Sequence, residues 1–159
     1  MMLTDKKIAF IGSGMMAEAM IKGLLREELV KPTDLSAAGP RPERGRELAE
    51  RYGVEWTADN RQAASGRDIV ILSTKPQVMD AVLPELRGAI DEGALVLSIA
   101  AGMPIHIISD GLSHAAVVRA MPNTPAQIGE GITVWTATEE VTGDQMRQTE
   151  TILRALGLV

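Results

Sequence analysis

Two glycines one residue apart, Gly12 and Gly14, stand between an apolar run and a stretch with helical periodicity. With Ala17 they form a GxGxxA pattern. Its first glycine permits a tight turn, its second lets a pyrophosphate approach the backbone, and its small third residue keeps the helix close to the strand. The N–H groups of the first helical turn would face the phosphates, where the helix dipole favours negative charge. The pattern predicts a dinucleotide-binding loop; the alternative is an ordinary glycine turn.

The residues after the second apolar run bear on which dinucleotide would bind. NAD-binding domains tend to place an acid there, about 20 residues past the glycines, to hold the ribose 2′-hydroxyl. This chain instead has AAGPRPERGRE, in which Arg41, Arg44 and Arg46 follow the run. A guanidinium pairs well with a 2′-phosphate. We therefore expect NADP(H) to be preferred over NAD(H), with Arg41 as the first candidate and Arg44 as the second. The alternative is that these arginines only solvate a helix start.

Apolar runs of strand length alternate with amphipathic segments of helical length, which is typical of a parallel sheet covered by helices on both faces. We expect strands at 7–12, 35–39, 54–56, 68–74, 94–100, 115–121 and 132–137. The expected helices are 15–28, 43–53, 77–90, 105–112 and 143–157, the second of them closed by Gly53. The sequence predicts an α/β fold with a Rossmann-type doubly wound, mostly parallel sheet.

Polar or small residues follow several of the expected strands. Asn60 comes shortly after the third strand, Thr74–Pro76 end the fourth, and Ser98–Gly102 end the fifth. Because ligands of open α/β sheets bind at the carboxyl ends of the strands, we expect these segments to lie together. The small residues of Ser98–Gly102 would let a flat ring lie against the backbone. Each segment taken alone could also be an ordinary loop.

The sixth expected strand continues into RAMPNTPAQIGEG, residues 119–131. Pro122 and Pro125 fix their own φ angles and keep the residue before each of them out of the helical region. The polar groups of Asn123 and Thr124 would therefore be held rigidly at the carboxyl edge of the sheet. A structural turn could use the same residues.

The composition argues against several function classes. With 16 basic and 21 acidic residues and a net charge of −5, the chain lacks the basic balance of a nucleic-acid-binding protein. The chain has no cysteine, and His106 and His114 have no carboxylates at metal-site spacing, so we expect no metal. No stretch approaches the ~20 apolar residues of a membrane span. We expect a cytoplasmic protein that acts on a small molecule, without nucleic-acid or membrane partners.

Five segments together resemble one protein family, the pyrroline-5-carboxylate reductases. They are FIGSGMMAEAMIKG, Asp59–Asn60, DIVILSTKP, LSIAAG and VVRAMPNTPAQIGEGIT, in matching order and spacing along the whole chain. The resemblance implies an oxidoreductase of proline biosynthesis. Such an enzyme transfers hydride from NAD(P)H to the ring C=N of 1-pyrroline-5-carboxylate and gives L-proline.

The resemblance also implies where cofactor and substrate would lie. It places cofactor contacts at Ile11, Gly12, Ser13, Gly14, Met15, Met16, Ala38, Gly39, Asn60, Ser73, Thr74, Lys75, Pro76, Ile99, Ala100 and Ala101. The charge argument adds Arg41 and Arg44 to these. The substrate-facing positions would be Met121, Asn123 and Thr124. No residue of this chain is assigned a catalytic role.

In this family a helical domain follows the nucleotide-binding domain, supplies most of the dimer interface and contributes substrate-binding residues. No segment of this sequence resembles it, so we expect residues 1–159 to form one NAD(P)-binding Rossmann domain, the cofactor half of the enzyme. The whole enzyme would be a homo-oligomer through the helical domain. The half alone would be a monomer or a weak dimer with little or no turnover.

Two other functions fit the glycine loop. One is a stand-alone NADP-binding module that senses dinucleotide without chemistry, and the other is another short NADP-dependent reductase, such as a deazaflavin-dependent NADP oxidoreductase or a β-hydroxyacid dehydrogenase. A sensor would need only the adenosine half of the site, so the segments STKP and MPNTPA argue against the first. The MPNTP segment argues against the second.

Overall fold

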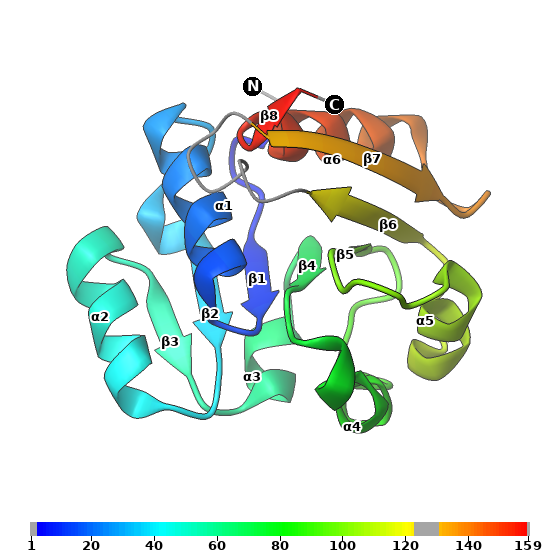
Figure 1. Cartoon of the computed structure of the whole chain (residues 1–159), viewed down its shortest axis with the longest axis horizontal. Helices are drawn as coiled ribbons and strands as arrows, with labels where there is room; N and C mark the ends of the chain where they lie inside the picture. The colour runs from blue at the N-terminus through cyan, green and yellow to red at the C-terminus, as the bar shows by residue number, and fades with distance from the viewer. Residues whose placement is uncertain (1–2, 123–130, 159) are drawn as a thin grey trace.

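The computed structural model describes residues 3–122 and 131–158, which form one sheet with helices on both faces (Figure 1). Within these residues the sheet has eight strands in the order β3-β2-β1-β4-β5-β6-β7-β8. Neighbouring strands from β3 to β6 are parallel, β7 is antiparallel to β6, and β8 is parallel to β7. The strands are β1 (Ile8–Ile11), β2 (Leu35–Ala38), β3 (Glu55–Thr57), β4 (Ile69–Leu72), β5 (Leu95–Ser98), β6 (Val117–Pro122), β7 (Gly131–Ala137) and β8 (Gly157–Leu158).

Helices cover the two faces in two groups. The helical elements are α1 (Met15–Arg26), the short 3₁₀ helix η1 (Pro32–Asp34), α2 (Pro42–Tyr52), α3 (Asn60–Ala64), α4 (Pro76–Leu86), α5 (Ile105–Leu112) and α6 (Gly143–Arg154). Buried residues of α1, α2 and α6 belong to one apolar cluster, and those of α3, α4 and α5 belong to another. The sheet therefore lies between two helical layers.

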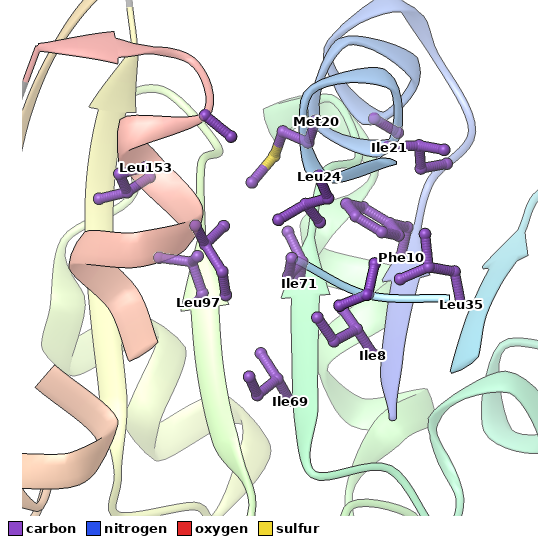
Figure 2. Packing of buried hydrophobic residues seen from close by; sticks show 14 of the residues in the cluster. Ile8, Phe10, Met20, Ile21, Leu24, Leu35, Ile69, Ile71, Leu97 and Leu153 are labelled. Atoms are coloured by element: carbon purple, nitrogen blue, oxygen red, sulfur yellow. The ribbon is translucent and has the colours of Figure 1, made fainter. Parts of the chain in front are cut away.

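Alternate residues of the central strands pack on opposite faces. In β4, Ile69 and Ile71 belong to the cluster under α1, α2 and α6, whereas Val70 and Leu72 belong to the cluster under α3, α4 and α5. Figure 2 shows the first cluster, in which side chains of α1 and of the central strands fill the space between helix and sheet. Because both faces are covered, the strands read as continuous apolar runs in the sequence.

The predicted fold class is confirmed. The parallel strands follow the order 3-2-1-4-5-6, the order of a doubly wound dinucleotide-binding sheet. Each predicted strand overlaps an observed one, and the ends of the observed strands differ from the predicted ends by at most two residues. Gly53 closes α2 in the left-handed region at φ 74°, as predicted.

Three short elements were not predicted, namely η1, α3 and β8. The five-residue helix α3 begins because the Asp59 carboxylate accepts hydrogen bonds from the N–H groups of Arg61 and Gln62, at 3.0 and 3.2 Å. Asn60, expected in a loop, is therefore the first residue of a helix.

Three predicted helices are shorter in the structure, and in two of them a left-handed residue follows the end. The segment 15–28 ends at Arg26, since Glu28 takes φ 54°, and the segment 77–90 ends at Leu86, before Gly88 at φ 83°. The last helix ends at Arg154 rather than at residue 157, because Gly157 starts β8 beside β7.

Candidate functional site

The carboxyl ends of the parallel strands meet at one edge of the sheet. At this edge, β1 lies between β2, which leads to β3, and β4, which leads to β5 and β6. The chain therefore reverses its direction of winding next to β1, and open α/β sheets bind ligands in the crevice at such a switch point. The loop Gly12–Gly14 leaves β1 at this place and leads into α1 (Figure 1).

Gly12 is required by the packing of the chain itself. Its φ is 109°, and a β-carbon there would lie 2.7 Å from the Ser73 carbonyl carbon and 2.8 Å from the Thr74 nitrogen. The Ser73 hydroxyl donates toward the Gly12 carbonyl at 2.9 Å, and the Ser73 N–H donates to the Ile11 carbonyl at 2.8 Å. The loops after β1 and β4 are thus held in direct contact, and only glycine fits between them.

The contacts among the described residues do not explain why residue 14 is a glycine. Its φ is −83°, which any residue adopts, and a β-carbon there would have no atom of the described residues within 4 Å. It is the N-cap of α1, whose end receives no side-chain cap bond. The N–H groups of the first helical turn have no carbonyl acceptor within the helix. The donors and the room above Gly14 fit a pyrophosphate that lies against the backbone.

A second glycine-mediated contact closes the loop toward β2. A β-carbon at Gly39 would overlap the Ser13 hydroxyl oxygen, so the first residue after β2 must be small for Ser13 to sit there. The Gly39 N–H donates to the Thr57 carbonyl at 3.2 Å, which continues the ladder toward β3. The predicted residues Gly12, Ser13, Gly39 and Ser73 are thus brought together by direct contacts.

Arg44 of α2 lies against the glycine loop, and all three nitrogens of its guanidinium have partners. Its Nε donates to the Ser13 carbonyl at 2.7 Å, and its Nη2 donates to the Gly14 carbonyl at 3.2 Å. The same Nη2 lies 2.7 Å from a carboxylate oxygen of Glu18, and Nη1 lies 3.2 Å from Glu47. Its side chain is only 12% exposed. Arg44 therefore joins α2 to the loop and to the first turn of α1.

Glu18 receives two further donors, the Tyr52 hydroxyl at 2.6 Å and the Arg51 guanidinium at 3.1 Å. Burial raises the pKa of Glu18, but the hydrogen bonds from Tyr52 and Arg44, with the charges around them, outweigh this effect and lower it below its ordinary value. Burial and the bond to Glu18 raise the pKa of the Tyr52 hydroxyl. The sequence analysis missed Glu18, Arg51 and Tyr52. No local motif links residues 33 or 34 positions apart, as these are.

The other two arginines of this region are exposed. Arg41 is the exposed N-cap residue of α2, and Arg46 is exposed one turn further along that helix. Among the residues with described positions, neither side chain has a hydrogen-bond or ion-pair partner. Arg46 borders a hollow of about 510 Å³ along β3, between α2 and α3, which no residue of the glycine loop lines. Arg41 lies near the end of β2, where the sequence predicts the ribose 2′-phosphate of NADP(H).

The remaining predicted cofactor residues follow the neighbouring strands at the same edge. The Asn60 amide donates to a Glu85 carboxylate oxygen at 2.6 Å, which ties α3 to α4. Thr74 donates toward the Met79 sulfur at 2.9 Å, Lys75 is the N-cap of α4, and Pro76 is its first residue. Ile99 and Ala100 follow β5 and are largely covered, whereas Ala101 is exposed.

Two methionines border this edge with large exposed surfaces. Met15, at the start of α1, is 69% exposed, and Met121, near the end of β6, is 49% exposed. Met16 is half-buried against the core. Asn123 and Thr124, predicted to face the substrate, lie outside the described residues. Across residues 3–122 and 131–158 there is no cluster of side chains that could hold a metal ion, and no helix is long and apolar enough to cross a membrane.

Residues 7–102 match the protein family described as NADP oxidoreductase, coenzyme F420-dependent. The chain belongs to this family. The matched region runs from β1 past β5 and ends before the MPNTP segment, so it covers the glycine loop and the strand ends that follow it. The prediction of an NADP-linked oxidoreductase domain is confirmed by this membership.

Relatives along the whole chain confirm the resemblance to pyrroline-5-carboxylate reductases. The reductase of Synechocystis is 37% identical over 153 residues, which is 96% of this chain and 57% of the relative. The reductase structure from Coxiella burnetii is 37% identical with a TM-score of 0.93, and the match covers 97% of this chain and 57% of the Coxiella chain. The structure of Plasmodium falciparum pyrroline carboxylate reductase with NADP bound shares the fold at 24% identity and a TM-score of 0.84, with 97% and 56% covered. The chain thus spans little more than half the length of these relatives.

Proposed function

We propose that this chain is the cofactor-binding half of a pyrroline-5-carboxylate reductase, and that it binds NADP(H) in preference to NAD(H). The observation that carries the proposal is the contrast between the two glycines. Gly12 is explained by contacts within the chain, whereas a β-carbon at Gly14, at the N-terminus of α1, would have no described atom within 4 Å. The family membership and the relatives named above support the same reading.

The residues present would hold the dinucleotide along the carboxyl edge of the sheet. The N–H groups at the start of α1 would bind the pyrophosphate, and the guanidinium of Arg41, which has no partner among the described residues, would pair with the 2′-phosphate. The segments Ser73–Pro76 and Ile99–Ala101 would flank the nicotinamide, and Met121, Asn123 and Thr124 would border the substrate. When bound, the reduced nicotinamide supplies the hydride for the substrate C=N.

In this proposal the chain contributes orientation rather than acid–base chemistry. A protonated cyclic imine is already a good hydride acceptor, so holding donor and acceptor in line can account for roughly 7–11 kcal/mol of the barrier. A helical domain beyond these residues would complete the substrate side and the homo-oligomer. The half alone would then bind dinucleotide as a monomer or weak dimer, with little or no turnover. We place the enzyme in the cytoplasm, without nucleic-acid or membrane partners.

Calorimetric titration with NADPH and NADH in parallel tests the cofactor assignment. We expect NADPH to bind more tightly, and Arg41→Ala to weaken NADPH binding by about 10–100-fold while NADH binding stays unchanged, because a hydrogen bond to a charged group contributes roughly 1.5–3 kcal/mol. Arg46→Ala is the matched control, since Arg46 is also exposed and without a partner among the described residues, but borders the hollow along β3. Equal affinities of the unaltered chain would overturn the 2′-phosphate assignment, and binding of neither dinucleotide would overturn the cofactor half itself.

The family description favours a second candidate, an NADP oxidoreductase that uses coenzyme F420. Both candidates share the NADP site, so they differ in the partner of the nicotinamide. Titration of the NADP-loaded chain with coenzyme F420 separates them. Saturable binding of coenzyme F420 would support the second candidate, and its absence would favour the imine reductase.

A further inference from the structure

The guanidinium of Arg44 joins α2 to the glycine loop and to the first turn of α1, which lie about 30 residues earlier in the chain. It donates to the carbonyls of Ser13 and Gly14, at 2.7 and 3.2 Å, and it forms an ion pair with Glu18 at 2.7 Å. We call these four residues the Arg44 clamp. The clamp lies on the α2 side of the loop, whereas the open space lies above Gly14.

The planarity of the peptide bond gives these contacts a consequence for the donors of the loop. In a trans peptide the C=O and the following N–H point in opposite directions. The Ser13 carbonyl shares its peptide plane with the Gly14 N–H, and the Gly14 carbonyl shares its plane with the Met15 N–H. Holding both carbonyls toward α2 therefore aims both N–H groups away from α2.

The two carbonyls differ in what else holds them. The Gly14 carbonyl also accepts the first bond of α1, from the Glu18 N–H at 3.1 Å. Among the described residues, only Arg44 donates to the Ser13 carbonyl. Without the Arg44 side chain, the Ser13–Gly14 peptide would be free to rotate because Gly14 is permissive in φ.

Glu18 places a negative charge one turn inside α1, close to where a pyrophosphate would bind. Arg44 pairs with it at 2.7 Å, so its field at the loop is offset. Glu18 in turn holds the guanidinium in the orientation from which Nε and Nη2 reach the two carbonyls. The fork of an arginine can make these contacts at once, whereas a lysine ammonium cannot.

We propose that Arg44 is a positioning residue for dinucleotide binding, which orients the Gly14 and Met15 N–H groups toward the pyrophosphate by holding the Ser13 and Gly14 carbonyls. This inference rests on the proposed function, and it assigns Arg44 a role different from the predicted contact with a 2′-phosphate. A residue that orients the pyrophosphate loop acts equally on NADPH and NADH, because the two share the pyrophosphate. A residue that contacts the 2′-phosphate acts on NADPH alone.

The test measures NADPH and NADH affinities of the chain with Arg44→Ala, Arg44→Lys and Arg51→Ala, at a temperature where each variant is folded. We expect Arg44→Ala to weaken both dinucleotides by about tenfold or more and to leave their ratio unchanged, since preorganisation is lost. Arg44→Lys should lose nearly as much, because it keeps the charge without the fork. Arg51→Ala is the matched control. It removes another partner of Glu18 that does not touch the loop, and should change both affinities less than about threefold.

Several results would overturn the positioning role. An effect of Arg44→Ala on NADPH alone would assign Arg44 to the 2′-phosphate, and full affinity of Arg44→Lys would show that charge suffices. Amide chemical shifts of Gly14 and Met15 in the unliganded chain give a second readout that does not depend on the dinucleotide. If the unaltered chain binds neither dinucleotide, the proposed function fails; shifts in Arg44→Ala but not in Arg51→Ala would still support the clamp, and unchanged shifts would overturn it.

Discussion

A methyl group added at Gly14 would meet no described part of the chain, so Gly14→Ala should weaken dinucleotide binding without unfolding the chain. No atom of residues 3–122 or 131–158 lies within 4 Å of the new β-carbon, and alanine adopts a φ of −83° without strain. Alanine restricts the unfolded chain, which stabilises by about 0.4–1 kcal/mol. It is a poorer N-cap than glycine, which costs a similar amount. The free energy of unfolding should therefore stay within about 1 kcal/mol of its original value.

The same methyl would stand where the pyrophosphate approaches the backbone. We expect the Kd for NADPH and for NADH to rise by at least about tenfold, or about 1.4 kcal/mol, since the phosphates can no longer reach the N–H groups of the first turn of α1. Calorimetric titration measures the loss of binding, and urea unfolding of the same samples measures the stability.

Gly12→Ala is the matched control, because it should lower the stability of the chain, whereas Gly14→Ala should lower its affinity for the dinucleotide. A β-carbon at φ 109° costs about 1–3 kcal/mol in strain, and its overlap with the Ser73 backbone adds about 1–3 kcal/mol. At roughly 2–4 °C per kcal/mol for a chain of this size, the melting temperature should fall by roughly 4–24 °C. Unchanged binding by Gly14→Ala would refute the location of the dinucleotide. A loss of stability in Gly14→Ala as large as in Gly12→Ala would refute the reasoning from open space.

Two further predictions concern stability. Because the pKa of Glu18 is lowered in the folded chain, its contribution is fully present above the unfolded value of about 4.5 and is lost as the pH falls through the lowered value. The difference in unfolding free energy between the original chain and Glu18→Gln, measured in urea from pH 7 to pH 3, should therefore shrink on the acid side. A constant difference would contradict this. Thr142 and Gln145 form a reciprocal capping box at the start of α6, so Thr142→Ala should cost about 1 kcal/mol in the same assay while Thr142→Ser retains the stability. Equal losses in both variants would exclude the hydroxyl as the cause.

The glycine loop and the sheet could be predicted because their signals are local. A strand buried on both faces must be apolar throughout, as Ile69–Leu72 are, and the turn that follows β1 needs a glycine at Gly12. The short helix α3 could not be predicted with the same means. It depends on one side-chain cap, from Asp59, and its five residues show no helical periodicity.

The structure places Arg44 against the glycine loop, whereas its predicted contact with a 2′-phosphate stays a prediction. Its position after β2 and its charge indicated a residue near the dinucleotide, but its partners Ser13 and Gly14 lie 31 and 30 residues earlier in the chain. Which of two nearby arginines stays free is decided by tertiary contacts. Glu18, Glu47 and the loop carbonyls engage Arg44, whereas Arg41 at the helix N-cap has no partner among the described residues. We therefore expect Arg44 to hold the glycine loop and Arg41 to contact the 2′-phosphate, although both follow β2. Parallel titrations of Arg41→Ala and Arg44→Ala with NADPH and NADH test this difference, because loss of the first should affect NADPH alone and loss of the second should affect both.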